Sequence, residues 1–377
     1  MEFRDLKRQY QSLKSEIDSA VLSVINETKF INGPQVGQLE NELAEYIGVK
    51  HCISCANGTD ALSLAMMAWD IGPGDAVFVP DFTFFSSGEI VLHCGATPVF
   101  VDLEIDTFNI SPASLEKMIQ KVSEEGKLQP RAVIAVDLFG LPADYDAIRI
   151  ITDKYKLLLL EDGAQGFGGN IDGKMACSFG DISTTSFFPM KPLGCYGDGG
   201  AVFTDDDECA DKIKSIKVHG KGKDKYDNIR IGINSRLDTI QAAILLVKLK
   251  AFRERELEAI NGIAVKFVEG LKNYVITPIV PDGYFSSWAQ YTIRLQDKNK
   301  RDELAAFLNK KGIPTAVYYS KAMHRQDAFG DVLYRNDSDC LNTLVLTETV
   351  LSLPIHPYMT EEDVGFIIDY IIMGIKD

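Results

Sequence analysis

The fold class is decided by one stretch in the middle of the chain, Leu157-Leu158-Leu159-Leu160-Glu161-Asp162-Gly163-Ala164-Gln165. Its four consecutive leucines lack the alternation of a strand with one wet face, and they indicate a strand that is covered on both faces. A second run of this kind is Ala132-Val133-Ile134-Ala135-Val136. Because strands covered on both faces belong to mostly parallel sheets, the two runs predict an α/β protein built in layers.

Other short apolar segments extend this sheet in both directions along the chain. We expect seven strands, at Cys52–Cys55, Ala76–Pro80, Pro98–Asp102, Ala132–Asp137, Leu157–Glu161, Ile182–Phe187 and Gly200–Thr204. Helical patterns lie between several of them, at Asp60–Trp69, Ser86–His93, Pro112–Lys121 and Tyr145–Lys154. In open α/β sheets the ligand binds at the carboxyl ends of the strands, so functional residues are expected there.

The last third of the chain has a different pattern. A long helical segment is expected over Asp238–Leu271, followed by a smaller mixed region with strands at Ala289–Leu295 and Thr315–Tyr319 and helices at Arg301–Lys311 and Thr360–Ile375. The length of 377 residues suits about two domains. We therefore predict a large domain over 1–249 and a small domain over 250–377.

Composition excludes several classes of protein. The formal net charge of −15 argues against binding to nucleic acid or to anionic membranes, which both attract basic proteins. The charged start, Met1–Arg8, is unlike a signal peptide, and no apolar run approaches the roughly 18–20 residues of a spanning helix. Seven cysteines, an odd number, are typical of reduced thiols. We therefore expect a cytoplasmic protein with no membrane and no nucleic-acid partner.

Cys52 and Cys55 form a C-x-x-C pair, but it lies in a predicted strand. No second pair follows at the spacing of a zinc site, so no metal is expected.

Three loops at predicted strand ends carry groups that suit chemistry. Asn57-Gly58-Thr59 opens a helix, where free backbone amides can bind an anion, although an ordinary capped helix start has the same residues. Asp162 ends an otherwise apolar strand, so its carboxylate needs a cationic partner unless the strand end is exposed. Lys191 follows the next strand among apolar residues, and burial would lower its pKa and make the amine nucleophilic. A surface lysine is the alternative.

The three loops are more specific together than singly. An anion-binding loop, a carboxylate at position 162 and a lysine 29 residues later match the three needs of pyridoxal 5'-phosphate (PLP). The loop anchors the phosphate, the carboxylate keeps the pyridine nitrogen protonated, and the lysine holds the aldehyde. The sequence therefore predicts PLP as the cofactor.

Further motifs point to one family. They are Phe30-Ile31-Asn32-Gly33-Pro34, Asn57-Gly58-Thr59-Asp60-Ala61-Leu62, Thr83-Phe84, Glu161-Asp162-Gly163-Ala164-Gln165, Ser186-Phe187-Phe188-Pro189-Met190-Lys191, Gly232-Ile233-Asn234-Ser235-Arg236 and His324-Arg325-Gln326. On these motifs nearly the whole chain resembles the DegT/DnrJ/EryC1/StrS family of PLP-dependent sugar aminotransferases. The resemblance implies aminotransferase fold type I, with a mostly parallel seven-stranded sheet and a smaller C-terminal α/β domain.

The resemblance also implies the roles of single residues. Lys191 holds the cofactor aldehyde and Asp162 pairs with the pyridine nitrogen. Phe84 stacks on the ring, and Gln165 lies beside the ring and its 3-hydroxyl. The phosphate is held by Gly58, Thr59 and Ser186, and by Asn234 reaching across from the second subunit of a homodimer with shared active sites.

A basic stretch, Lys212–Arg236, stands out from the acidic chain with eight basic and only two acidic residues. It is either a solvated flexible loop or a basic rim that attracts an anionic substrate such as a nucleotide diphosphate sugar. Arg230 and Arg236 lie nearest the family motif, and the planar guanidinium can grip a carboxylate or diphosphate. We expect Arg236 to bind a substrate carboxylate.

The implied reaction moves an amino group from L-glutamate to a keto-sugar nucleotide, with Lys191 as general base and acid. The pattern looks closest to the branch that aminates UDP-2-acetamido-2-deoxy-3-keto-glucuronate for surface polysaccharide, such as lipopolysaccharide O-antigen. Tyr318, Tyr319 and His324 are expected to face the sugar. Many members have His-Tyr-Pro where this chain has Tyr318-Tyr319-Ser320, and Ala where it has Gly163. A 4-keto or other 3-keto UDP- or dTDP-sugar is therefore the alternative substrate.

Three other functions are weighed against this reading. Sugar dehydratases of the same fold carry histidine at the lysine position, so Lys191 argues against that activity. A regulatory protein without turnover would not need Lys191, Asp162 and Ser186 together. A nucleic-acid binder would need interleaved aromatic residues and a positive net charge, and the chain has neither.

Overall fold

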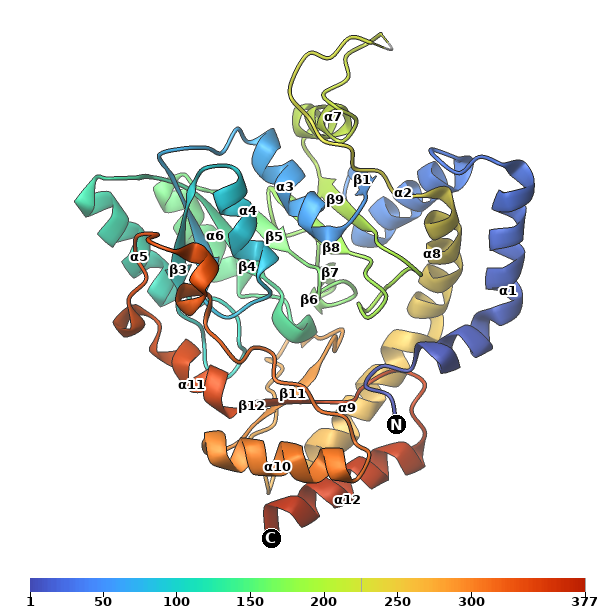
Figure 1. Ribbon diagram of the computed structural model, residues 1–377, viewed down its shortest axis with the longest axis vertical. Coiled ribbons are helices and arrows are strands. Elements are labelled where there is room, and N and C mark those ends of the chain that lie inside the picture. Colours follow the sequence, from blue (N-terminus) through green and yellow to red (C-terminus); the bar gives the residue numbers. More distant parts are fainter. Residues whose placement is uncertain (225, 377) are drawn as a thin grey trace.

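The computed structural model describes residues 1–224 and 226–376, and a seven-stranded sheet lies at the centre of its larger part (Figure 1). The strand order is β1-β9-β8-β5-β4-β2-β3. The strands are β1 (His51–Cys55), β2 (Asp75–Pro80), β3 (Thr97–Val101), β4 (Gln129–Val136), β5 (Leu158–Asp162), β8 (Ile182–Ser186) and β9 (Gly200–Thr204). All seven predicted strands are confirmed.

Consecutive residues of β5 serve two different cores. Leu160 packs with Ile134 and the helices on one face, whereas Leu159 packs with Val133 on the other, and all four side chains are fully buried. The first face is covered by α3 (Gly58–Ala68), α4 (Ser86–His93) and α7 (Asp207–Ile216), and the second by α5 (Pro112–Glu125) and α6 (Tyr145–Tyr155). The leucine run is continuous because neither face of the strand meets water.

The sheet is mostly parallel, as predicted. β2 pairs in parallel with β3 and β4, and β5 pairs in parallel with β4 and β8. β9 runs antiparallel to both of its neighbours, β8 and β1. The carboxyl ends of β1, β2, β4, β5 and β8 therefore meet at one edge of the sheet.

Two helices at the start of the chain were not predicted. α1 (Leu6–Glu27) begins after Asp5, whose carboxylate accepts a hydrogen bond from the backbone amide of Arg8 at 2.8 Å. α1 and α2 (Pro34–Ile47) both pack against α8 (Thr239–Ala251), shown at the right of Figure 1. The predicted helix over Asp238–Leu271 is present as α8, a π-helical turn at Phe252–Glu256, and α9 (Leu257–Leu271).

A second core lies in the C-terminal part, built by apolar residues between 260 and 371. It joins α9, α10 (Lys298–Lys310) and α12 (Glu361–Lys376) to a two-stranded sheet of β11 (Tyr291–Arg294) and β12 (Val350–Leu353). The predicted strand at 315–319 is wrong, because only Ala316 pairs there, in an isolated bridge to Ser352. The position of the domain boundary at 249/250 stays a prediction.

Within 1–224 and 226–376, the helices are all too short or too polar to cross a lipid bilayer.

Candidate active site

The loops that follow the parallel strands open onto a cavity of about 700 Å³ between the large sheet and the C-terminal part. Every strand-end residue that the sequence singled out for the cofactor within one subunit lines this cavity: Gly58, Thr59, Phe84, Asp162, Gln165, Ser186 and Lys191. The shared edge of the sheet brings these residues together, although 133 positions separate the first from the last.

Asp162 is the last residue of β5 and is 5% exposed. Burial raises the pKa of its carboxyl group, while the Ser87 hydroxyl and the charge of Lys191 act in the opposite direction. Ser87 donates a hydrogen bond to Asp162 Oδ2 at 2.8 Å, and the Ala164 amide donates to Oδ1 at 3.2 Å. Two donors leave an ionised carboxylate under-satisfied, so the position suits a cationic ligand atom.

Lys191 lies in the turn after β8, where its backbone amide donates to the Phe188 carbonyl at 2.8 Å. Burial lowers the pKa of its amine; Asp162 acts in the opposite direction, and Arg4 lowers the pKa further. The lowered pKa increases the fraction of neutral amine, which is the form that attacks a carbonyl group.

The amino-terminal end of α3 forms an anion cradle. The Asn57 side chain caps the helix by accepting a hydrogen bond from the Asp60 amide at 2.8 Å. A Cβ atom built on Gly58 would lie 2.6 Å from Ser186 Cβ, so only glycine lets the two loops approach this closely. The free amides of the first helical turn and the hydroxyl groups of Thr59 and Ser186 suit a phosphate.

Phe84 and Gln165 lie on the walls of the cavity. Phe84 is 55% exposed, which is high for phenylalanine and leaves its ring available for stacking. Gln165 is buried, accepts a hydrogen bond from the Phe139 amide at 2.9 Å and donates to the Tyr319 hydroxyl at 3.3 Å. Tyr318 and Tyr319 also line the cavity, as expected of residues that face a substrate.

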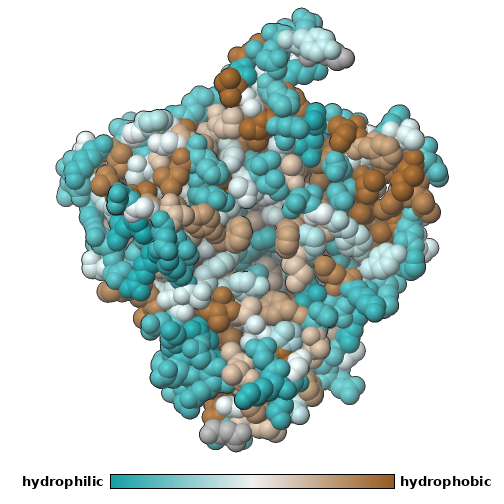
Figure 2. Space-filling view, viewed as in Figure 1, coloured by the Kyte–Doolittle hydropathy of each residue, from teal (hydrophilic) through white to brown (hydrophobic). Residues whose placement is uncertain are grey.

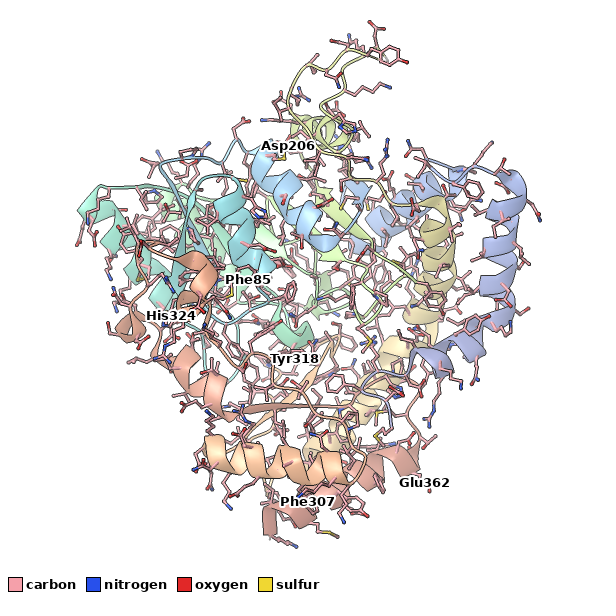
Figure 3. The ribbon with its side chains drawn as sticks, viewed as in Figure 1. Phe85, Asp206, Phe307, Tyr318, His324 and Glu362 are labelled. Atoms are coloured by element: carbon pink, nitrogen blue, oxygen red, sulfur yellow. The ribbon has the colours of Figure 1, made fainter. Side chains whose placement is uncertain are left out.

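His324 does not line the cavity, contrary to the predicted substrate contact. Its ring is 2% exposed, with Nδ1 2.6 Å from Asp81 Oδ2 and Nε2 2.8 Å from Asp337 Oδ1. Figure 3 shows His324 well apart from Tyr318. Both ring nitrogens are therefore engaged in tying the 321–337 segment to the end of β2. Cys340 lies close enough to make Asp81, His324 and Cys340 a possible group of metal ligands.

Asn234, Arg230 and Arg236 do not line the cavity either. Asn234 is exposed, and its Oδ1 accepts a hydrogen bond from Arg236 at 2.6 Å. They lie on the segment after α7, part of which projects from the top of the molecule in Figure 1. Other members of the basic stretch are paired: Lys212 with Asp70, Lys214 with Asp211 and Lys217 with Glu40. Lys225 lies outside the described residues.

Sequence reasoning missed several residues of the site, three of which bear directly on its chemistry. Ser87 holds Asp162, while Phe3 and Arg4 form part of the cavity wall from the start of the chain. Ser87 follows the Thr83-Phe84 motif and lies in the first turn of α4, which is a usable signal. Phe3 and Arg4 precede the first helix and follow no strand, so no local pattern marks them.

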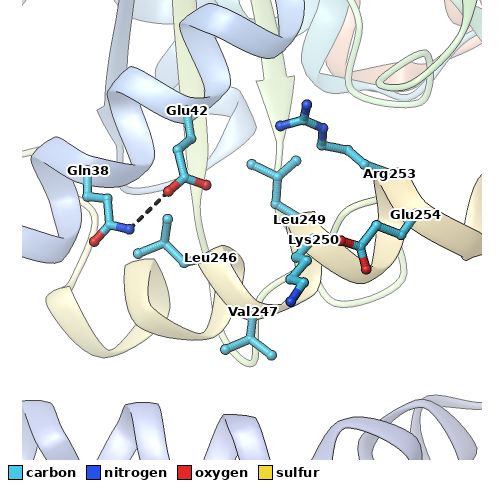
Figure 4. A pocket seen from close by; sticks show the side chains of 8 residues that line it. All are labelled: Gln38, Glu42, Leu246, Val247, Leu249, Lys250, Arg253 and Glu254. Atoms are coloured by element: carbon cyan, nitrogen blue, oxygen red, sulfur yellow. Dashed lines mark hydrogen bonds between the residues drawn. The ribbon is translucent and has the colours of Figure 1, made fainter.

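A hollow of similar size, about 690 Å³, lies between α2 and α8 (Figure 4). Its charged side chains are Glu42, Lys250, Arg253 and Glu254, and Gln38 donates a hydrogen bond to Glu42 at 2.9 Å. It lies away from the strand ends. The cavity beside Lys191 is therefore the candidate active site.

The sheet, the half-buried lysine beside a buried carboxylate, and the anion cradle fit PLP and define the class of fold-type-I aminotransferases. Comparison with known proteins agrees. Residues 11–372 match the DegT/DnrJ/EryC1/StrS aminotransferase family. The chain belongs to this family, so it is a PLP-dependent aminotransferase that acts on nucleotide sugars.

Individual relatives cover the chain almost completely. The UDP-2-acetamido-2-deoxy-3-oxo-D-glucuronate aminotransferase of Pseudomonas aeruginosa is 43% identical over 97% of this chain and 98% of its own. A pleiotropic regulatory protein of Geobacillus stearothermophilus is 40% identical over 97% of this chain and 96% of its own. The crystal structure of a DegT DnrJ EryC1 StrS aminotransferase from Brucella abortus matches with a TM-score of 0.97 and 46% identity, covering both chains completely.

The close approach of Gly58 to Ser186 gives a test of the anion cradle. Gly58→Ala is expected to weaken PLP binding by about tenfold or more, because the new methyl group must push the two loops apart. Gly37→Ala is the matched control, since a Cβ there meets nothing within 4 Å. The measurement is titration of each apoprotein with PLP. Equal affinities for the two variants would contradict the assignment of the cradle.

The environment of His324 gives a pH prediction. Burial alone would lower the pKa of His324, but its contacts with Asp81 and Asp337 outweigh burial and raise it. A raised pKa stabilises the fold below the unfolded value of about 6.5, and this stabilisation is lost as pH rises through the folded pKa. His324→Gln is expected to cost about 2–4 kcal/mol at low pH, because buried Asp81 loses its cationic partner and keeps the backbone amide of residue 324 as a donor.

Denaturant unfolding between pH 5.5 and 8.5 measures the free energy of unfolding of the wild type and of His324→Gln. The difference between the two should narrow as the pH rises. Exposed His93 is the control, and His93→Gln should change the free energy of unfolding by at most about 0.5–1 kcal/mol. A difference for His324→Gln that widens with pH would be inconsistent with the raised pKa.

Proposed function

We propose that the protein transfers the amino group of L-glutamate to UDP-2-acetamido-2-deoxy-3-keto-glucuronate, giving the 3-amino sugar for surface polysaccharide such as lipopolysaccharide O-antigen. The observation that carries this proposal is the end-to-end similarity to the P. aeruginosa aminotransferase whose name gives that substrate. The seven cysteines, none of which forms a disulfide, support a cytoplasmic location.

We propose the cofactor roles that the resemblance implied. When bound, PLP supplies an electron sink and carries the amino group between the two substrates. Gly58, Thr59 and Ser186 hold its phosphate, Phe84 packs on its ring, and Gln165 lies beside the ring. The supporting observation is that one cavity collects all of these residues.

Lys191 and Asp162 divide the catalytic work. Lys191 binds the cofactor at rest and moves a proton to and from the reacting carbon of each substrate, as general base and acid. Its lowered pKa supports this role, because the amine must lose its proton to act as a base. Asp162 would keep the ring nitrogen of bound PLP protonated, and Ser87 fixes the direction of its carboxylate.

We also propose a homodimer in which Asn234 reaches the phosphate of the partner subunit. Its side chain is exposed and does not line the cavity of its own subunit, so it is available to a second one. Apolar side chains are left uncovered nearby, with Ile231 88% exposed. Figure 2 shows another apolar area on the right side, over α1, where Leu22 is 57% exposed. Exposed groups of this kind suit an interface.

Arg236 and Arg230 would then face the substrate in the partner's cavity, with Arg236 on its carboxylate. Tyr318 and Tyr319 would face the sugar within the same subunit. A 4-keto or other 3-keto UDP- or dTDP-sugar is the second candidate, because Tyr318 replaces a histidine of many relatives at the sugar-facing position.

The substrate proposal is tested with a panel of acceptors. Purified holoenzyme with L-glutamate is expected to form 2-oxoglutarate fastest with the UDP-3-keto uronate, and more slowly with neutral UDP- and dTDP-keto-sugars. The control is Lys191→Ala, which should show neither turnover nor the visible absorbance of lysine-bound PLP. Preference for a 4-keto sugar would select the alternative, and no product with any acceptor would reject the activity.

The shared active site is tested by mixing inactive variants. Lys191→Ala and Asn234→Asp each damage one half of the proposed site, the latter by placing a carboxylate against the phosphate. Co-refolded or co-expressed, they should recover up to about a quarter of wild-type activity, because half of the dimers contain one intact site. If every site were built from one chain, mixing would recover no activity.

A further inference from the structure

The start of the chain runs across the mouth of the active site before α1 begins. Phe3 and Arg4 both line the cavity, and the Phe3 ring packs edge-on against Tyr318 with centroids 6.1 Å apart. The segment is tied to the C-terminal part by Arg8, which forms an ion pair with Asp363 at 2.5 Å. The Arg4 side chain is therefore held at a fixed place in the cavity wall.

The Arg4 guanidinium lacks the partner that a buried cation requires. Its Nη2 donates to the Pro192 carbonyl at 3.2 Å, whereas Nη1 is buried and has no hydrogen-bond partner. Within the part of the chain that the structure describes, no carboxylate lies within 4 Å of the Arg4 guanidinium. Burial lowers the pKa of Arg4 to about 10, and the charge of Glu256 acts in the opposite direction. Arginine remains charged at this pKa, so the site keeps an unsatisfied cation.

This cation lies close to the reacting amine. Pro192, which accepts the hydrogen bond from Arg4, directly follows Lys191, and the charge of Arg4 helps to lower the pKa of Lys191. The acidic side chains of the wall are Asp162, which is held by Ser87, and Asp198, and both have the same sign as a carboxylate ligand. Lys321, also in the wall, is paired with Asp327 at 3.2 Å. Apart from Lys191, which the proposed function assigns to the cofactor, Arg4 is thus the cation of the wall that forms no ion pair within the described residues.

We propose that Arg4 binds the carboxylate of a substrate whose reacting carbon is held at Lys191. The inference rests on the proposed function, in which both substrates, the amino donor and the uronate, carry a carboxylate. The forked guanidinium can donate two parallel hydrogen bonds to it, which a neutral sugar hydroxymethyl group cannot accept in the same way. Arg4 is then a specificity-determining residue inside the cavity, distinct from Arg236 on the loop outside it.

The experiment measures the two half-reactions separately with the holoenzyme, following the change in cofactor absorbance. The donor is L-glutamate, and the acceptors are the UDP-3-keto-2-acetamido uronate and its neutral 3-keto-2-acetamido-glucose counterpart. Arg4→Gln is expected to raise KM for one carboxylate-bearing substrate by about 10- to 100-fold with little change in kcat. Arg4→Lys, which keeps the charge without the fork, should recover part of this loss.

The two sources of the carboxylate give different results. If the uronate is the ligand, Arg4→Gln raises KM only for the uronate and leaves KM for the neutral acceptor and for L-glutamate unchanged. If the donor is the ligand, Arg4→Gln raises KM for L-glutamate and leaves KM for both acceptors unchanged. Lys7→Gln is the matched control, since it removes an exposed charge from the same segment outside the cavity, and it should leave both half-reactions within about twofold.

Binding provides a second measurement that does not depend on turnover. Calorimetric titration with 2-oxoglutarate should show weaker binding in Arg4→Gln if the donor carboxylate is the ligand. Unchanged KM for both carboxylate substrates, or an equal loss for the neutral acceptor, would overturn the assignment. A wild-type enzyme that turns over neither acceptor would instead reject the proposed function. The role of Arg4 would then be rejected as well if Arg4→Gln bound both 2-oxoglutarate and the UDP-3-keto uronate as tightly as the wild type does.

Discussion

The constraint on which the structure depends is the burial of both faces of the central strands. Leu159 and Leu160 point into different cores, so the middle of β5 has no side chain that meets water. Polar chemistry is therefore confined to the strand ends, and the parallel arrangement places those ends along one edge. Asp162, Ser186 and the Gly58 loop come together for this reason, and not because of any contact between neighbours in sequence.

Burial also prepares the electrostatics of the site. Removing Asp162 and Lys191 from water disfavours the charged form of each, so the pKa of the acid rises and that of the amine falls. Their mutual attraction opposes both shifts without cancelling them. A ligand with a cationic ring atom near Asp162, an aldehyde at Lys191 and an anionic group at the start of α3 would relieve each of these positions. The arrangement is thus matched to the charge distribution of PLP.

The sequence could predict where the central strands lie and which residues follow their carboxyl ends. The continuous apolar runs marked the strands, and the residues directly after them, Asp162 and Lys191, follow from the geometry of parallel sheets. The sequence could not predict the surroundings of His324, because its partner Asp81 lies 243 positions away in the chain. A family motif identifies the histidine but does not give the direction of its side chain. The strand expected at 315–319 is absent because Tyr318 and Tyr319 line a cavity and the segment pairs with another strand only through one isolated bridge. Arg4 has no local signal at all.

Net charge proved to be a poor guide to ligand charge in this protein. The chain carries a formal charge of −15, yet the features that suit anions are backbone amides, hydroxyl groups and one buried guanidinium. Amides contribute no formal charge, and a single buried cation acts at short range, where solvent screens it least. Three of the eight basic residues in the stretch that composition made conspicuous are paired with acids, as Lys212 is with Asp70. An acidic surface and an anion-binding cavity are therefore compatible, because distance and desolvation decide which charges a substrate meets.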